Sequence, residues 1–142
     1  MKIITIGDIH GESNWINFED IKILIEHPFL KTDFDKYIFV GDYTDSFTKT
    51  NVEIKDTLLK LIQFKKNYTD NVILLWGNHD VEYFYNLKKG KNVSGFRPEA
   101  FWDLHIIFNE NKDLFQLSYQ YKNYIWTHAG IHQGWYEYEF NS

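Results

Sequence analysis

The chain has 142 residues, of which 44% are hydrophobic and 19% aromatic, so we expect one domain, residues 1–142, with a buried core. It contains no cysteine, which excludes disulfide bonds and thiolate metal ligands and favours a reducing compartment. A net charge of −5 argues against stable binding along a nucleic acid, because that needs a basic surface. No apolar run is long enough to span a membrane and no signal peptide opens the chain, so we expect a cytoplasmic protein without membrane contact.

Short apolar segments rich in β-branched and aromatic residues recur along the chain, and each is followed by polar residues and glycine. They predict buried strands at residues 3–6, 37–40, 72–76 and 124–127. Helical patterns fall between them, at about residues 13–26 and 51–64 and from Pro98 to about residue 108. The first three strands therefore alternate with helices, and we expect an α/β fold.

Two of the predicted helices have a recognisable apolar face. In the first helix Ser13 is the expected N-cap, and the expected inward side chains are Trp15, Phe18, Ile21 and Ile25. In the second helix the expected inward side chains are Leu58, Leu61 and Ile62.

The last part of the chain follows a different pattern. Apolar and polar residues alternate from Phe115 to Tyr121, with Leu117 and Tyr119 among the apolar ones, and a turn at Lys122-Asn123 follows. We expect an antiparallel hairpin there, formed with residues 124–127 and joined to the α/β part.

The polar residues that follow the strands are the candidates for a functional site. Asp8 and His10 follow the first strand, Asp42 the second, Asn78 the third and His128 the fourth. Ligands of open α/β sheets bind beyond the carboxyl ends of the strands, so we expect these side chains to converge on one crevice. Glycines beside them allow backbone and ligand to approach closely.

The chemistry of these side chains indicates metal binding. Asp8 and His10 are two residues apart, so in an extended chain they point to the same side and can bind one ion. Asp42 can bridge two ions with its two oxygens, while Asn78 and His128 offer an amide oxygen and an imidazole nitrogen. Oxygen and nitrogen donors without thiolate suit Mn, Fe or Zn. Two such ions would activate a water molecule and clamp an in-line phosphoryl displacement.

Each cluster also has a purely structural explanation. The sequence GDYTD is typical of a turn, GNHD of a turn followed by a helix N-cap, and a histidine such as His128 is often only hydrogen-bonded. His27 and His105 are interpreted as structural. We favour a functional site because four successive strand ends carry metal donors beside glycine, which turns alone do not explain.

The segments GDIHG (7–11), GDYTD (41–45), GNHD (77–80) and HAG (128–130) resemble the ordered motifs of calcineurin-like metallophosphoesterases. In style they are most similar to the branch of serine/threonine protein phosphatases and symmetrical diadenosine tetraphosphatases. The resemblance implies an α/β/β/α sandwich with mixed sheets and two divalent metal ions. It also implies a phosphorylated substrate, a phosphomonoester or a nucleotide polyphosphate, that a metal-bound hydroxide attacks.

The resemblance also assigns roles to individual residues. Asp8 and His10 would hold the first ion, Asp42 would bridge both ions, and Asn78 and His128 would hold the second. His79 would donate a proton to the leaving oxygen. Asp45 would pair with His79 and keep its ring protonated and oriented.

The chain departs from the motifs of that branch at its phosphate-binding arginines. Ser46-Phe47 and Trp76 stand where the branch has them, so Arg97 is the candidate substitute for substrate binding. An arginine that starts a surface helix explains Arg97 equally well. GNHD, with Asp80, also occurs in phosphodiesterases and nucleases of the superfamily, and such an activity is our alternative.

The family usually supplies a further metal-binding histidine well beyond the HAG motif. Here only residues 131–142 follow, and we do not expect His132 among them to replace that ligand. We therefore expect an N-terminal portion of the domain whose C-terminal segment is missing. A catalytically incomplete domain that binds one metal ion, none, or a partner is the third hypothesis.

Overall fold

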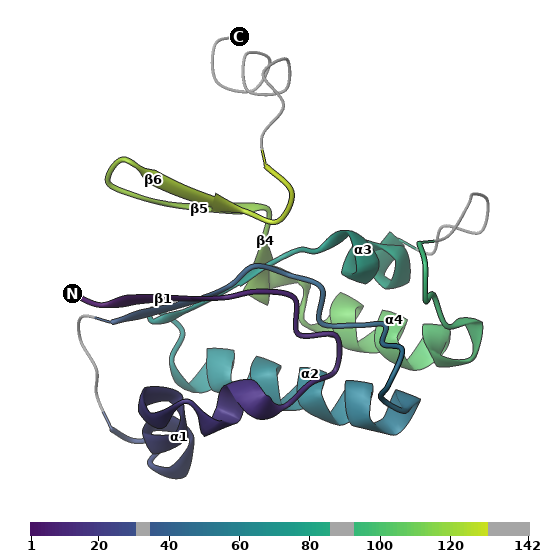
Figure 1. Ribbon diagram of the computed structural model, residues 1–142, viewed down its shortest axis with the longest axis horizontal. Helices are drawn as coiled ribbons and strands as arrows, with labels where there is room; N and C mark the ends of the chain where they lie inside the picture. Colours follow the sequence, from purple (N-terminus) through teal and green to yellow (C-terminus); the bar gives the residue numbers. More distant parts are fainter. Residues whose placement is uncertain (31–34, 86–92, 131–142) are drawn as a thin grey trace, which may run out of the picture.

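Four parallel strands form the central sheet of the computed structural model, which describes residues 1–30, 35–85 and 93–130 (Figure 1). They are β1 (Ile3–Ile6), β2 (Lys36–Phe39), β3 (Val72–Leu75) and β4 (Phe115–Gln116), in that order across the sheet. The register pairs Ile6 with Phe39, and Leu74 with both Phe39 and Phe115. The first three predicted strands are confirmed, with ends that shift by no more than one residue.

Helices cover one face of this sheet, where Figure 1 shows α1, α2 and α4 side by side beneath the strands. The α-helices are α1 (Glu19–Glu26), α2 (Asn51–Asn67), α3 (Asn78–Tyr85) and α4 (Phe101–Glu110). Short 3-10 helices, η1 (Asn14–Asn17), η2 (Pro98–Ala100) and η3 (Lys112–Leu114), precede or follow them. Pro98 opens η2, which leads directly into α4, so the predicted start of that helical segment is confirmed.

Helix α2 shows how the sequence fixes the start of an element. Thr50 accepts a hydrogen bond from the backbone N–H of Glu53, and the Glu53 carboxylate accepts one from the backbone N–H of Thr50. This capping box satisfies N–H groups that have no partner within the helix. The predicted inward side chains Leu58, Leu61 and Ile62 are all buried.

The first predicted helix is wrong in its continuity. Phe18 has an extended backbone (φ −61°, ψ 124°), which separates η1 from α1 and changes the direction in which later side chains point. Trp15 and Ile21 are buried as predicted, but Leu24 is buried in place of Ile25, and Phe18 and Ile25 are exposed. Ser13 is the N-cap residue of η1, as predicted, but its side chain makes no capping hydrogen bond.

The prediction of one strand from Phe115 to Tyr121 is likewise wrong. Phe115 pairs with Leu74 in the parallel sheet, and its ring packs against Trp76 with ring centroids 4.7 Å apart. The chain then crosses to a second sheet at Leu117, whose side chain is 68% exposed. The hairpin itself is confirmed, because β5 (Ser118–Tyr121) pairs antiparallel with β6 (Tyr124–Thr127).

The described residues thus form three layers: helices, parallel sheet and antiparallel hairpin (Figure 1). The larger core lies between the helices and the sheet, and a smaller one around Ile38, Ile73 and Leu75 lies between the sheet and the hairpin. Trp126 of β6 donates a hydrogen bond from Nε1 to Thr5 of β1 at 3.0 Å. The α/β class with parallel and antiparallel sheets is confirmed, and each sheet is uniform in its own pairing.

Among the described helices, none has the length and apolar character needed to cross a membrane.

Candidate functional site

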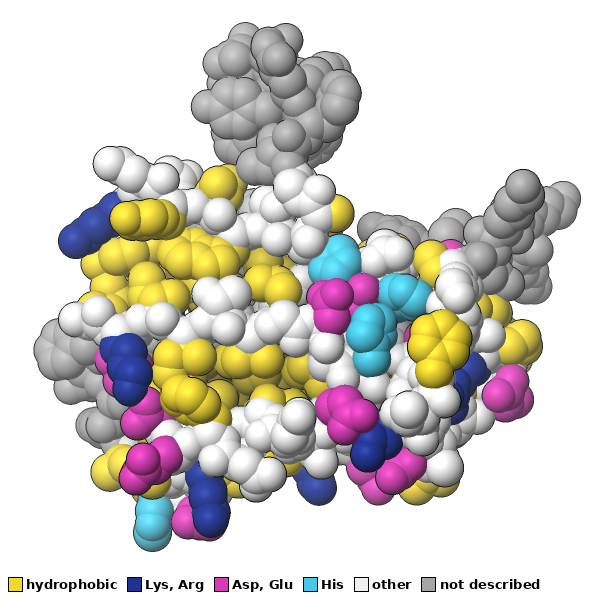
Figure 2. Space-filling view, in the orientation of Figure 1, with side chains coloured by type: hydrophobic (Ala, Val, Ile, Leu, Met, Phe, Trp, Pro, Cys, Tyr) yellow, Lys and Arg dark blue, Asp and Glu magenta, His cyan; other side chains and the backbone are white. Residues whose placement is uncertain are grey.

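The predicted site residues come from four loops that meet at one end of the sheets. Asp8 and His10 follow β1, Asp42 and Asp45 follow β2, Asn78 and His79 open α3 after β3, and His128 follows β6. Figure 2 shows histidine and acidic side chains gathered in one cluster on the visible face. Although β6 belongs to the second sheet, its end reaches this cluster, because Nδ1 of His128 donates to the carbonyl oxygen of Val40 at 2.8 Å.

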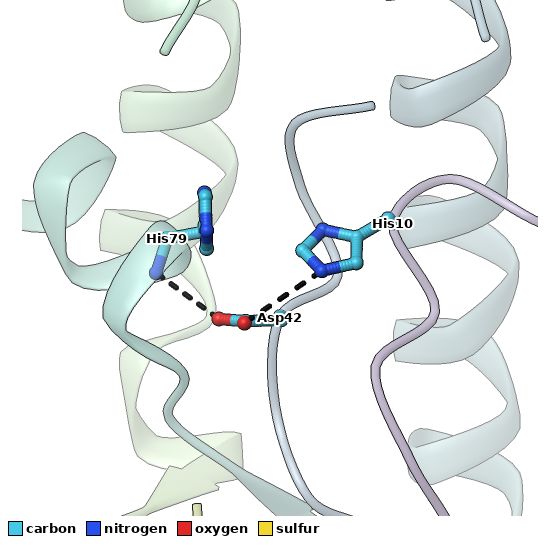
Figure 3. Close-up of side chains that lie close together, drawn as sticks. All are labelled: His10, Asp42 and His79. Atoms are coloured by element: carbon cyan, nitrogen blue, oxygen red, sulfur yellow. Dashed lines mark hydrogen bonds and ion pairs between the residues drawn. The ribbon is translucent and has the colours of Figure 1, made fainter. Parts of the chain in front are cut away.

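Asp42 is the centre of the cluster, and the residue is almost wholly buried (4% exposed). Its Oδ2 lies 3.3 Å from Nε2 of His128 and 3.7 Å from Nε2 of His10. Its Oδ1 accepts a hydrogen bond from the backbone N–H of His79 at 3.1 Å, and Figure 3 shows it between His10 and His79. One carboxylate is therefore surrounded by donors from three other loops.

Two groups of metal donors share this carboxylate. In each group every donor atom lies within 4.8 Å of the others; one comprises His10, Asp42 and His79, and the second comprises Asp8, Asp42 and His128. Asn78 joins the second group, since its Oδ1 lies 2.9 Å from Nε2 of His128. The structure thus brings the other four predicted metal ligands around Asp42.

The grouping of Asp8 and His10 differs from the expected pair on an extended chain. The backbone of His10 is left-handed (φ 44°), so the alternation of side chains in a strand does not continue to this residue. Asp8 consequently lies with His128, and His10 with His79.

Backbone carbonyls fix the ring orientation of both predicted histidine ligands. Nδ1 of His10 lies 2.9 Å from the carbonyl oxygen of Thr44, and Nδ1 of His128 makes the bond to Val40 described above. A carbonyl oxygen only accepts, so in both rings Nδ1 carries a proton, and Nε2 is the nitrogen that faces Asp42. Metal-binding histidines are commonly held this way, and the mixed oxygen and nitrogen donors fit a divalent metal ion.

His79 and Asp45 form the predicted pair beside these donors. Nδ1 of His79 donates to Oδ2 of Asp45 at 2.8 Å. The other ring nitrogen, Nε2, takes no part in this hydrogen bond. Asp45 is buried, and burial raises its pKa, although hydrogen bonds from Tyr83 and His79 oppose the rise. The second oxygen of Asp45 accepts the hydroxyl proton of Tyr83.

Tyr83 is a site residue that the sequence interpretation missed. It lies four residues after His79 in α3, and residues at that spacing share one face of a helix. That spacing was the available signal, because it places the hydroxyl of Tyr83 on the side of α3 that His79 occupies.

Asp80 holds the loop after β2 rather than binding at the site. Its fully buried carboxylate accepts backbone N–H bonds from Asp42 (2.8 Å), Tyr43 (2.9 Å), Thr44 (3.1 Å) and Gly77 (3.0 Å). Burial raises the pKa of Asp80 to about 7, and the carboxylate of Asp42 adds to this rise while the hydrogen bonds oppose it. The carboxylate thus ties the start of α3 to the loop that carries Asp42.

That loop has an unusual backbone. Asp42 and Asp45 both have left-handed conformations (φ 58°), as does His10. Such conformations are unfavourable for residues with a Cβ and persist where surrounding contacts enforce them, often at functional sites. The hydrogen bonds to Asp80, and one from the backbone N–H of His10 to the carbonyl oxygen of Asp42 (2.8 Å), are such contacts.

Gly41 and Gly77 allow the two loops to meet. A Cβ on Gly41 would lie 2.6 Å from the backbone nitrogen of Gly77, and one on Gly77 would lie 2.1 Å from that of Asp42. Gly7 differs, because nothing lies within 4 Å of a Cβ added there. Close approach of the backbone therefore explains the glycines of GDYTD and GNHD, but not the first glycine of GDIHG.

Arg97 and Trp76 both have structural partners. The guanidinium of Arg97 donates to Oδ1 of Asn51 at 2.7 Å and to the backbone carbonyl of Ser46, so it joins the loop after Asp45 to α2. Trp76 packs its ring on Phe115. Because its side chain is uncharged, it does not take the place of a phosphate-binding arginine. His132, the histidine considered as a further ligand, lies outside the described residues.

Two cavities flank the cluster. One, of about 390 Å³, lies beside His79 and Asp45 and is also lined by Glu12, Phe47 and Gly95. The other, also of about 390 Å³, lies beside Asn78 and His128, between Trp76 and Leu117. The cluster therefore borders a cavity on two sides.

Comparison with known proteins identifies the family. Residues 1–141 match the calcineurin-like phosphoesterase family. The chain belongs to it. The family expected from the four motifs is therefore confirmed.

The relatives of this calcineurin-like chain include both kinds of protein in the branch that the motifs resemble. The chain is 26% identical over 141 residues to a symmetrical bis(5'-nucleosyl)-tetraphosphatase of Buchnera aphidicola, a match that covers 95% of this chain and 46% of that protein. It is 32% identical over 115 residues to a serine/threonine-protein phosphatase of Caenorhabditis elegans, covering 78% and 22% respectively. Human serine/threonine-protein phosphatase 5 is 37% identical over 83 residues, covering 57% and 14%. The chain thus spans less than half the length of these relatives.

Proposed function

We propose that this chain hydrolyses phosphoric esters with two divalent metal ions, Mn, Fe or Zn, bound around Asp42. The observation that carries the proposal is the sharing of the Asp42 carboxylate between two groups of donors. Asp8, His10, Asn78 and His128 complete the ligand set. Family membership supports the class of reaction, and the names of the relatives support a phosphomonoester or a nucleotide polyphosphate as substrate.

The protein groups divide the work according to their positions. Two divalent ions held by these ligands would activate water and neutralise charge on the phosphoryl group. Asp42 would keep the two binding positions adjacent, because one carboxylate serves both. His79 would hold a proton at Nε2 for the leaving oxygen, and Asp45 would hold the ring through Nδ1. Arg97 would make at most a peripheral contact with the substrate, because its guanidinium already donates hydrogen bonds to Ser46 and Asn51.

Metal counting combined with an activity assay tests the proposal. We expect about two Mn²⁺ per chain and Mn²⁺-dependent hydrolysis of p-nitrophenyl phosphate in the unaltered protein. Asp42→Asn is expected to lower metal occupancy and to reduce turnover by about 100-fold or more. Asp56→Asn, an exposed aspartate on α2, is the matched control and should change neither quantity. Unchanged turnover in Asp42→Asn would refute the bridging role.

The roles of Asn78 and His79 separate in the same assays. His79→Ala is expected to lower turnover by about 100-fold while metal occupancy is retained, because the residue acts on a proton. Asn78→Ala is expected to weaken one of the two metal positions. Loss of one ion in His79→Ala would mean that His79 is a ligand, as its place in one donor group allows.

Two alternatives are distinguished by the substrate and by the metal count. Faster hydrolysis of bis-p-nitrophenyl phosphate than of the monoester would favour a phosphodiesterase or nuclease. Metal binding without turnover of either compound would favour a catalytically incomplete domain.

A further inference from the structure

Helix α3 carries two side chains that meet the same carboxylate. His79 donates from Nδ1 to Oδ2 of Asp45 at 2.8 Å, and the hydroxyl of Tyr83 donates to Oδ1. Both oxygens of Asp45 are therefore engaged, each by a different residue of one helix face. Among the described residues, these two side chains are the hydrogen-bond partners of the Asp45 carboxylate.

The direction of the Tyr83 hydroxyl is fixed from its other side. The backbone N–H of Arg97 donates to the Tyr83 oxygen at 2.9 Å. Since the oxygen accepts that bond, its own proton is free to point at Asp45. The ring is fully buried and stacks on Phe96 with ring centroids 5.0 Å apart, so packing and two hydrogen bonds set its position.

We propose that Tyr83 is a positioning residue for His79, acting through Asp45. By holding Oδ1, it fixes the carboxylate plane so that Oδ2 faces Nδ1 of His79, and the imidazole then presents Nε2 to the leaving oxygen. The backbone of Asp45 is left-handed, and the Tyr83 bond is one of the contacts that orient the side chain there. This inference rests on the proposed function, in which His79 is the proton donor.

The demand for a proton depends on the leaving group, and this gives a specific readout. p-Nitrophenolate leaves readily without protonation, whereas phenolate is more basic and needs the acid. A variant with a misplaced acid should therefore lose more activity with phenyl phosphate than with p-nitrophenyl phosphate. General acids contribute about 100-fold or more, and a displaced one retains part of this, so we expect Tyr83→Phe to show a differential loss of about 10-fold in kcat/KM.

Tyr68→Phe is the matched control. Tyr68 is also a buried tyrosine, and its hydroxyl donates to the backbone carbonyls of Leu24 (3.0 Å) and His27 (2.8 Å), away from the site. It should leave the ratio of the two substrates unchanged. In a His79→Ala background, Tyr83→Phe should add no further differential loss, because coupled residues are not additive. An equal loss with both substrates, or the same differential loss without His79, would overturn the proposal.

A measurement that needs neither metal nor turnover separates this inference from the proposed function. Proton NMR of the metal-free protein should show a downfield Nδ1–H resonance of His79, identified by its absence in His79→Ala. Tyr83→Phe should shift or broaden it, and Tyr68→Phe should not. Circular dichroism checks that both variants are folded, as expected because the ring is kept. An unmoved resonance would overturn the role of Tyr83, whereas a shifted resonance in a protein that hydrolyses neither phosphate would support it and refute the proposed function alone.

Discussion

Replacing Gly77 by alanine would place a methyl group where the loops of Asp42 and Asp80 meet. The added Cβ would lie 2.1 Å from the backbone nitrogen of Asp42, 2.3 Å from its Oδ1 and 2.8 Å from Oδ2 of Asp80. Ordinary contact begins near 3.4 Å, so backbone as well as side chains must move. Gly7→Ala is the matched control, because a Cβ there meets nothing within 4 Å.

The expected magnitude follows from this difference. Overpacking of a rigid site costs about 1–3 kcal/mol, and the upper end applies here because the nearest atom is backbone. A loss of about 3 kcal/mol is a large part of the 5–15 kcal/mol that typically stabilises a domain. Gly7→Ala should change the free energy of unfolding by less than about 1 kcal/mol, toward higher stability, since it restricts the unfolded chain.

Urea denaturation followed by tryptophan fluorescence measures both free energies of unfolding. Gly77→Ala should lower the midpoint while the slope stays constant, which indicates a change of stability alone. It should also weaken metal binding, measured by titration calorimetry, because the Asp42 carboxylate is displaced. Equal free energies of unfolding for the two alanine variants would refute the steric reasoning.

Three further outcomes follow from features outside the cluster around Asp42. Thr50→Ala removes half of the α2 capping box and should lower the free energy of unfolding by about 1 kcal/mol in urea denaturation. Burial raises the pKa of Tyr37 to about 12 from the usual 10.0, so the folded chain keeps this proton longer than the unfolded chain does. Stability should therefore fall as the pH rises from about 10 toward 12, as measured by the loss of circular dichroism. Leu117→Ser, at the exposed crossing between the sheets, should change the free energy of unfolding by less than about 0.5 kcal/mol, whereas a larger loss would indicate that the side chain is buried in solution.

The strands and their polar ends were predictable because apolar segments, which form buried strands, alternate along the sequence with short polar segments, which carry the site residues. A buried parallel strand needs an apolar run, and its end must supply the side chains of the site, so both appear as consecutive segments. The convergence of Asp8, Asp42 and His128 followed from this rule even though β6 lies in a different sheet.

The parts that failed depend on tertiary contacts that no local pattern contains. Alternation indicates which faces a strand presents, but not that the chain changes sheets at Leu117. An extended Phe18 resets the helical phase, so helical spacing across it misplaced Ile25. In the sequence Tyr83 is one aromatic residue among many. Its hydroxyl gains a carboxylate partner only because α3 packs beside Asp45.

The left-handed backbones of His10, Asp42 and Asp45 have a consequence for how this chain tolerates change. Glycine adopts such conformations without the steric conflict of a Cβ, so Asp42→Gly would relieve the backbone while removing the shared carboxylate. Natural or engineered variants that have lost the chemistry can therefore keep a well-folded domain. Among homologous sequences, a substitution at one of these positions could remove the activity without lowering the amount of folded protein. A stable, expressed protein would then be no sign of an intact site.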